Sequence, residues 1–316
     1  MSTAKINAKF LEGVQGSPHV HIAAVGSRSR ESAEHYAHEH GIERAHASYE
    51  ALLADPDVDV VYISLPNSLH VEWSVRALEA GKHVLCEKPL SRRADEAARA
   101  FDAAQGNGRL LMEGFMYRHH PQTRRLVELV QSGAIGELKL VRAAFSFPLP
   151  ATGNVRLSRE LDGGALMDVG CYCVSAARML AGEPHQVTAQ QTRHEDGVDI
   201  GFVATMAFPG DVLCHFDAGM SFAQRDALEA VGSNGSLFLD DPWHCRDPVI
   251  ELHRDGDVET IESEHANAYR LEAENLSAAI EGRAAPLLGR EDALGQARTL
   301  EALYEAADHG QAVTLA

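Results

Sequence analysis

The chain has few basic residues for its length. It contains 28 Lys plus Arg against 46 Asp plus Glu, so its formal net charge is −18. A field of that sign repels the phosphates of nucleic acids and the anionic surfaces of membranes. We therefore expect neither a nucleic acid nor a membrane as a partner, and a bound anionic cofactor would need local basic residues.

Cysteines and long apolar runs are also scarce. The five cysteines are widely scattered, and the closest pair, Cys171 and Cys173, has the wrong spacing for a zinc knuckle. Free buried thiols in a reducing compartment are expected, which indicates a cytoplasmic protein. No stretch approaches the roughly 18 apolar residues of a membrane span, and residues 1–5 have no signal-peptide character. The histidines lack metal-ligand spacing, so no metal site is predicted.

The length of 316 residues suits two domains. In the first third, apolar runs alternate with helical segments that end at glycines such as Gly41 and Gly81. Predicted strands are 20–26, 58–64, 83–86 and 109–115, and predicted helices are 31–40, 69–80 and 94–104. Strands nearly continuous in apolar residues and separated by helices predict a parallel Rossmann-type sheet, here assigned to residues 1–117.

After about residue 117 the pattern changes to strands with few helices between them. Predicted strands are 138–147, 186–193, 201–208, 212–218, 227–231, 236–239 and 249–253, and predicted helices are 121–131, 165–180, 269–281 and 291–309. Hairpin signals stand at Pro209-Gly210, Ser233-Asn234-Gly235 and Asp255-Gly256. The pattern predicts an α+β domain over residues 118–316 with an open, mainly antiparallel sheet.

The tripeptide Glu87-Lys88-Pro89 directly follows the predicted strand 83–86. Open α/β sheets bind their ligands at the carboxyl ends of the strands, and the proline restricts how Lys88 is presented. An ordinary surface turn with a charged pair is the alternative interpretation.

Four local motifs occur in one order along the chain: residues 2–7, 66–70, 87–89 and 163–172. Together they resemble the glucose-fructose oxidoreductase / inositol dehydrogenase family, Gfo/Idh/MocA, over essentially the whole chain. Residues 113–118 are similar to the branch with dimeric dihydrodiol dehydrogenases and bacterial D-xylose dehydrogenases. The resemblance implies a Rossmann domain followed by a domain built on an open antiparallel sheet.

The chain departs from this family pattern at its beginning. Ser2-Thr3-Ala4 stands in the place of a G-x-G turn, and the strand that normally precedes this turn is absent. Its absence would leave two strands without a partner and a slot in the core. We expect that Met1 is an internal position read as a start, with roughly eight to ten residues upstream. A truncated protein with poor cofactor affinity is the alternative.

The end of the second family strand determines the choice of cofactor. An acidic residue there would favour NAD, whereas this chain has Ser27 and Arg28, which suit the 2′-phosphate of NADP. NADP is therefore predicted, with NAD less favoured. The alternative interpretation is that Ser27 and Arg28 belong to a solvated helix start without a role in cofactor binding. The resemblance implies further cofactor contacts at Ser2, Thr3, Ala4, Ile6, Pro66, Asn67, His70, Glu87 and Lys88. His70 is equally typical of a helix-start histidine that faces solvent or bonds to the backbone.

Lys88, Asp168 and Tyr172 are the predicted catalytic residues. Removal of a hydride from an alcohol needs a base for the hydroxyl proton, and a phenol serves as that base only beside a cation such as Lys88. Asp168 and Tyr172 are spaced i, i+4 and so share one helix face, where Asp168 would position substrate or cofactor. A tyrosine here, rather than the histidine of the inositol branch, resembles the sugar and dihydrodiol branch. The alternative is a tyrosine buried in the core.

These features predict an NADP-dependent oxidoreductase that acts on a hydroxyl of a sugar-like or cyclic diol substrate, as a homodimer or larger homo-oligomer. A non-catalytic or cofactor-impaired relative with a binding or regulatory role is the alternative. A third possibility is an enzyme that keeps NAD tightly bound as a catalyst.

Overall fold

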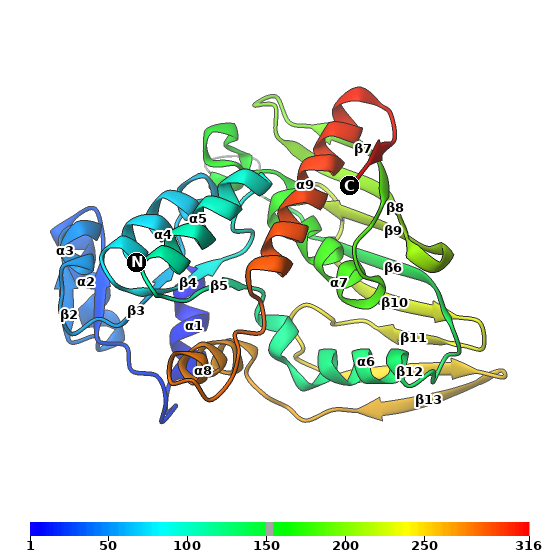
Figure 1. The fold of residues 1–316 in the computed structure, drawn as a ribbon, viewed down its shortest axis with the longest axis horizontal. Helices are drawn as coiled ribbons and strands as arrows, with labels where there is room; N and C mark the ends of the chain where they lie inside the picture. Colours follow the sequence, from blue (N-terminus) through cyan, green and yellow to red (C-terminus); the bar gives the residue numbers. More distant parts are fainter. Residues whose placement is uncertain (150–153, 316) are drawn as a thin grey trace. The chain divides into compact units, whose positions relative to one another are not determined.

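The computed structural model describes residues 1–149 and 154–315. By contacts, the chain divides into two compact units (Figure 1). The first comprises Met1–Ser91, Asp95–Met116 and Asn267–Leu294, and the second comprises Arg92–Ala94, Tyr117–Ala266 and Gly295–Ala316. A late helical segment is thus grouped with the amino-terminal unit, and the predicted domain boundary at residues 117 and 118 stays a prediction.

The first unit alternates short strands with helices, as its sequence pattern predicts. The strands are β1 (Ala24–Gly26), β2 (Arg44–His46), β3 (Val60–Ile63), β4 (His83–Glu87) and β5 (Leu111–Gly114). The helices are α1 (Ile6–Val14), α2 (Arg30–His40), α3 (Tyr49–Leu53), α4 (His70–Glu79), α5 (Ala94–Gly106) and α8 (Ala268–Ile280), with a 3₁₀ turn, η1, at Asn67–Leu69. All of the strand pairs are parallel. The Rossmann-type architecture is confirmed.

Both faces of β4 are covered, which explains its continuous apolar sequence. Val84, Leu85 and Cys86 are at most 2% exposed, although successive side chains of a strand point to opposite faces. Helices α4 and α8 both contact β4. In sheets whose strands are buried in this way, ligands bind beyond the carboxyl ends of the strands.

The parallel strands of the described chain form two separate sheets, β1-β2 and β3-β4-β5. A cavity of about 830 Å³ is lined by residues 20–25 on one side and 58–62 on the other. The first two residues contact both edges: the Met1 amino group donates to Tyr62 O (2.7 Å) and Ser2 N donates to Gly26 O (2.9 Å). Burial lowers the pKa of the Met1 amino group to about 5. The predicted slot is therefore present.

The strand predicted at residues 20–26 is wrong over its first half, since only Ala24–Gly26 form β1. A strand is stabilised by hydrogen bonds to neighbours, and β1 pairs only with the three residues of β2. Residues 20–23 instead line the cavity. Sequence reasoning also missed β2 and α3, which are too short to show a periodic pattern.

The second unit is built on a nine-stranded sheet in the order β13-β12-β11-β10-β6-β9-β8-β7-β14 (Figure 1). Its strands are β6 (Leu138–Ser146), β7 (Gln186–Arg193), β8 (Asp199–Phe208), β9 (Val212–Gly219), β10 (Arg225–Gly232), β11 (Ser236–Leu239), β12 (Val249–Arg254), β13 (Asp257–Glu262) and β14 (Val313–Thr314). Its helices are α6 (Pro121–Gln131), α7 (Cys171–Ala181) and α9 (Arg290–His309), the last of which begins in the first unit. Short helical turns are η2 (Met116–His119), η3 (Val155–Leu157), η4 (Arg159–Leu161), η5 (Leu166–Gly170) and η6 (Pro209–Asp211).

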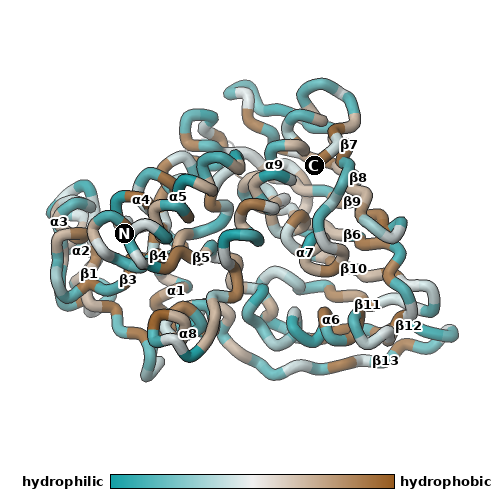
Figure 2. Tube along the Cα trace, viewed as in Figure 1, coloured by the Kyte–Doolittle hydropathy of each residue, from teal (hydrophilic) through white to brown (hydrophobic). Residues whose placement is uncertain are grey.

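Among the described strands of this sheet, only β6 and β9 pair in parallel, so the mainly antiparallel sheet is confirmed. The three predicted turns join β8 to β9, β10 to β11 and β12 to β13, and Asp255 and Gly256 both have positive φ. In Figure 2 the strands carry much of the hydrophobic colour and the connecting loops are largely hydrophilic. Helix α7 packs on β6 and β9 with residues 171–178 all buried.

All five cysteines are buried and carry thiols rather than disulfides, as predicted. Among the described residues, no helix combines the length and apolar character needed to cross a membrane.

Candidate functional site

The turn before α1 is held by hydrogen bonds around Ser2. Ser2 has φ +104°, its Oγ accepts from Ala4 N at 3.2 Å and lies 2.8 Å from Ser64 Oγ, and its carbonyl accepts from Asn7 Nδ2 at 2.9 Å. Thr3 is exposed, Ala4 and Ile6 are half-buried, and the first turn of α1 has no acidic side chain. A helix start of this kind suits an anionic phosphate group.

Ser27 and Arg28 lie where β1 ends and α2 begins. Ser27 is buried and its N–H donates to His46 O at 3.1 Å, while Arg28 is exposed. The Arg28 guanidinium lies near enough to Tyr49 to hydrogen-bond it and to oppose the rise that burial causes in the tyrosine pKa. Ser29 caps α2 by accepting from Ser32 N. The predicted arginine–serine pair thus borders the carboxyl end of β1.

The 66–70 segment follows β3 and is tied to the Lys88-Pro89 turn by His70. Pro66 precedes Asn67, which opens η1, and His70 begins α4. The His70 ring is 1% exposed, with Nδ1 2.9 Å from Pro89 O and Nε2 2.8 Å from Leu65 O. These contacts make His70 a link between two backbone segments, and its predicted cofactor contact stays a prediction.

Glu87, Lys88 and Pro89 lie at the carboxyl end of β4, as the sequence pattern predicts. Glu87 Oε1 accepts from Tyr62 Oη at 2.5 Å, and the Lys88–Pro89 peptide bond is cis. The next residue, Leu90, donates from its backbone N–H to Glu113 Oε1 at 2.7 Å. Lys88 is therefore presented by a segment that is fixed on both sides.

Sequence reasoning missed the buried carboxyl groups around this segment. Glu113 is 1% exposed and Glu272 is 0% exposed, and burial and then the charge of Glu87 raise the pKa of Glu272 well above its usual range. Glu113 is the penultimate residue of β5 and could have been suspected from its place among apolar residues. Glu272 comes from α8, far along the chain, so only the folded structure brings it here.

Asp168 and Tyr172 lie in the second unit, at the start of its most buried helix. The helix predicted over residues 165–180 begins with the π turn η5, and α7 follows from Cys171. Asp168 Oδ2 accepts from Arg156 Nε at 2.6 Å. Arg156 was missed because it lies in a segment without regular periodicity.

The Tyr172 ring is packed among other aromatic rings and is 7% exposed. Ring centroids lie 5.3 Å away for Phe145, 5.6 Å for Tyr117 and 5.8 Å for Trp243. Tyr117 Oη donates to Ser175 Oγ, and Trp243 Nε1 donates to Ala144 O. The Tyr172 ring is thus fixed by its aromatic neighbours, and its predicted catalytic role stays a prediction.

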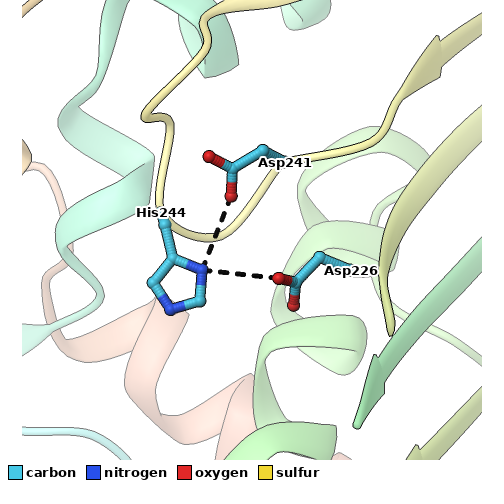
Figure 3. A group of neighbouring side chains, drawn as sticks. All are labelled: Asp226, Asp241 and His244. Carbon is cyan, nitrogen blue, oxygen red and sulfur yellow. Dashed lines mark ion pairs between the residues drawn. The ribbon is translucent and has the colours of Figure 1, made fainter. Parts of the chain in front are cut away.

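Asp226, Asp241 and His244 form a polar cluster in the same unit (Figure 3). His244 Nδ1 lies 3.5 Å from Asp241 Oδ1 and 3.7 Å from Asp226 Oδ2. Arg246 donates to both carboxylate oxygens of Asp241 at 3.1 Å. Burial raises the pKa of Asp241, but the nearby His244 ring and the hydrogen bonds from Arg246 outweigh it and leave that pKa well below its usual range.

The three ligand-type atoms of this cluster are close enough to hold a metal ion. Arg246, however, already neutralises Asp241 and lies 3.7 Å from Asp226 Oδ2, so we interpret the cluster as an ion network. The absence of a metal site stays a prediction.

The predicted site residues therefore fall into two groups. Ser2, Ser27, Pro66, His70, Glu87 and Lys88 gather at the carboxyl ends of β1, β3 and β4 in the first unit, and Asp168 and Tyr172 lie together in the second. His119, also in the second unit, is buried, which lowers its pKa to about 3, and the His120 side chain caps α6 by accepting from Gln122 N.

Known proteins match the chain along its whole length. The family model "Oxidoreductase family, NAD-binding Rossmann fold" matches residues 3–115, and "GFO/IDH/MocA C-terminal domain" matches residues 123–238. The D-xylose 1-dehydrogenase (NADP(+)) 2 of Haloferax volcanii is 39% identical over 100% of this chain and 98% of its own.

Solved structures agree with this assignment. The 3-ketoreductase KijD10 of Actinomadura kijaniata, in complex with NADP and TDP-benzene, superposes with a TM-score of 0.89 at 33% identity, covering 96% of this chain and 95% of its own. The aldose-aldose oxidoreductase of Caulobacter crescentus, complexed with glycerol, superposes with a TM-score of 0.89 at 30% identity. The match covers 99% of this chain and 96% of the chain of that oxidoreductase. The chain is a member of the Gfo/Idh/MocA family of oxidoreductases.

Proposed function

We propose that the protein is an NADP-dependent dehydrogenase that transfers a hydride between the nicotinamide cofactor and a hydroxyl of a sugar-like or cyclic diol substrate. The observation that carries the proposal is the placement of Lys88. It stands at the carboxyl end of β4, directly after Glu87, which accepts from Tyr62 Oη. It is followed by Pro89, whose carbonyl contacts His70, and by Leu90, whose N–H donates to Glu113. The similarity to an NADP(+)-dependent D-xylose dehydrogenase supports the substrate class and the cofactor, and the similarity to an NADP-bound ketoreductase also supports the cofactor.

The residues of the first unit fit such a cofactor. The positive φ of Ser2 and the acid-free first turn of α1 suit the pyrophosphate, with Thr3, Ala4 and Ile6 beside it. Ser27 and Arg28 would hold the 2′-phosphate, since no carboxylate occurs between residues 27 and 30. Pro66, Asn67 and Glu87, at the ends of β3 and β4, would contact the nicotinamide ribose.

When bound, the cofactor supplies the hydride acceptor or donor. In the oxidative direction Tyr172 accepts the proton of the substrate hydroxyl. The phenolate that results needs a cation to stabilise it, which is the role that the family resemblance implies for Lys88. Asp168, neutralised by Arg156, orients the substrate through its remaining hydrogen-bonding capacity. Lys88 also helps to hold the cofactor.

Replacement of Tyr172 by Phe tests the proposal. Loss of a proton-transfer group should lower kcat by about 10²- to 10⁴-fold, measured as substrate-dependent formation of NADPH. Lys88→Met should lower kcat to a similar extent and also weaken NADPH binding in a fluorescence titration.

Tyr117→Phe is the matched control for Tyr172→Phe, because it removes a hydroxyl from a second buried tyrosine of the same ring cluster, one that donates to Ser175 Oγ. Its activity should stay within a few-fold of that of the wild type. A Tyr172→Phe enzyme with a near-normal rate would refute the assignment of Tyr172, and no NADPH formation by the wild type with any aldose or diol would refute the activity.

A further inference from the structure

The helix-covered face of β10 carries one acidic residue among apolar ones. Leu228 and Ala230 on this face are 1% and 0% exposed, and Asp226 occupies the preceding position of the same alternation. Asp226 pairs directly with Phe145 of β6, so the two side chains point to the same side of the sheet. A carboxyl group in such a place costs free energy unless polar groups compensate it.

The compensating groups come from the loop between β11 and β12. His244 Nδ1 faces both Asp226 and Asp241, and Arg246 lies beside the same two carboxylates. Figure 3 shows that Nε2 of His244 lies on the far side of the ring and points away from both acids. The His244 side chain is 28% exposed, whereas those of Asp226 and Asp241 are 7% and 9% exposed. The two buried acids thus hold a ring whose other nitrogen remains available.

His244 and Tyr172 flank the same aromatic ring. The His244 ring meets Phe145 edge-on at 5.6 Å, and the Tyr172 ring meets it edge-on at 5.3 Å. Trp243, the neighbour of His244, lies 5.8 Å from Tyr172. Tyr172 and His244 therefore belong to one side-chain cluster built around Phe145.

We propose that His244, held by Asp226 and Asp241, is a substrate-binding residue whose Nε2 hydrogen-bonds a hydroxyl group of the sugar or diol other than the one that is oxidised. The inference rests on the proposed function, because Tyr172 marks the reacting hydroxyl. Aromatic surface with a few oriented polar groups is the usual composition of a small-molecule site. A hydroxyl both donates and accepts, so it can pair with Nε2 in either protonation state of the ring.

Two substitutions separate the roles of the two ring nitrogens. His244→Asn keeps a polar group near the position of Nδ1 and loses the Nε2 position, whereas His244→Gln reaches the Nε2 position. KM and kcat are measured with D-xylose and with trans-cyclohexane-1,2-diol, and NADPH affinity is measured separately. His244→Asn should raise KM about tenfold or more, with kcat within about threefold of the wild-type value. His244→Gln should raise KM less, and neither variant should change the affinity for NADPH.

Sugar binding is also read without turnover. Trp73 and Trp243 are the two tryptophans of the chain, so a Trp73→Phe background leaves Trp243 as the reporter beside His244. D-xylose should quench the fluorescence of Trp243, and the quenching should be weaker in His244→Asn. This result supports the inference even if the wild type oxidises no substrate, and in that case only the proposed function fails. Three results would overturn the inference about His244. They are KM values within about twofold of the wild type in both variants, equal losses of kcat and thermal stability without a change in KM, and an absence of sugar-dependent quenching.

Discussion

At the scale of single residues, Glu272 has the most unusual surroundings among the ionisable groups of the first unit. It is 0% exposed, and neither carboxyl oxygen has a hydrogen-bond partner among residues 1–149 and 154–315. Burial and the nearby charge of Glu87 raise its pKa well above the usual range. An ionised carboxylate in this place would be expensive, so the folded protein holds Glu272 protonated.

The raised pKa makes stability depend on pH in a defined direction. The unfolded chain ionises Glu272 above about pH 4.3, whereas the folded chain keeps the proton, so stability falls as the pH rises from that value toward the folded-state pKa. Glu272→Gln, which cannot ionise, should therefore match the wild type near pH 4.5 and exceed it by about 1–3 kcal/mol at pH 8.

Thermal unfolding of both proteins between pH 4.5 and 9 measures this effect. A difference in Tm that stays constant across the range would contradict it. Glu274, on the same helix and half-buried, offers a control, because Glu274→Gln should show no comparable growth of the difference with pH.

At the scale of elements, the slot between β1 and β3 interrupts the parallel strands of the first unit. Its walls include Phe10, Val25, Val61 and Leu85, all buried and apolar, and its volume is about 830 Å³. Polar side chains such as Asp59 and Arg109 also line it. Where apolar atoms face unfilled space, stability is lowered because those atoms lack contacts. The backbone edges of β1 and β3 that face it can pair with a further strand.

An apolar strand fused ahead of Met1 should therefore stabilise the protein. An extension of about six Val and Ile residues matches the usual strand length, and we expect it to raise Tm by several degrees and to tighten NADPH binding. A Gly-Ser extension of equal length is the control in differential scanning fluorimetry. Equal Tm values for the two extensions would show that the slot does not accept a strand.

At the scale of the whole molecule, the nine-stranded sheet has an exposed face over β8 and β9 in the part of the chain that the structure describes. Phe202, Ala204 and Met206 are buried on the covered face, whereas Val203 and Leu213 on the other are 54% and 56% exposed. Exposed apolar residues on an open sheet face are typical of interfaces between subunits. The homodimer and the cytoplasmic location both stay predictions.

If the protein dimerises through this face, one charged side chain introduced there should disrupt the dimer. Light scattering coupled to size exclusion should give twice the chain mass of 34.2 kDa for the wild type. Val203→Arg should shift the mass toward that of the monomer, because a buried unpaired charge is costly at an interface. Glu259→Arg on β13, which is also exposed, should leave the mass unchanged. A monomeric wild type would exclude this dimer.

The sequence by itself determined the elements whose signal is local. Periodicity and turn residues predicted α6, β7 and β11 to the residue, and the apolar run before Glu87-Lys88-Pro89 located the carboxyl end of β4. These features depend on side-chain patterning and backbone preferences within a few residues, which a sequence displays directly.

Only the tertiary structure decided which distant residues meet. The link from His70 to Pro89, the burial of Glu272 beside Glu87, and the cluster of Asp226, Asp241 and His244 each join segments separated along the chain. Local patterning cannot report such contacts, because they arise when sheets and helices pack and bring polar groups into a shared, water-poor environment. The same reason explains residues 20–23, whose β-type sequence forms no strand where no partner lies beside it.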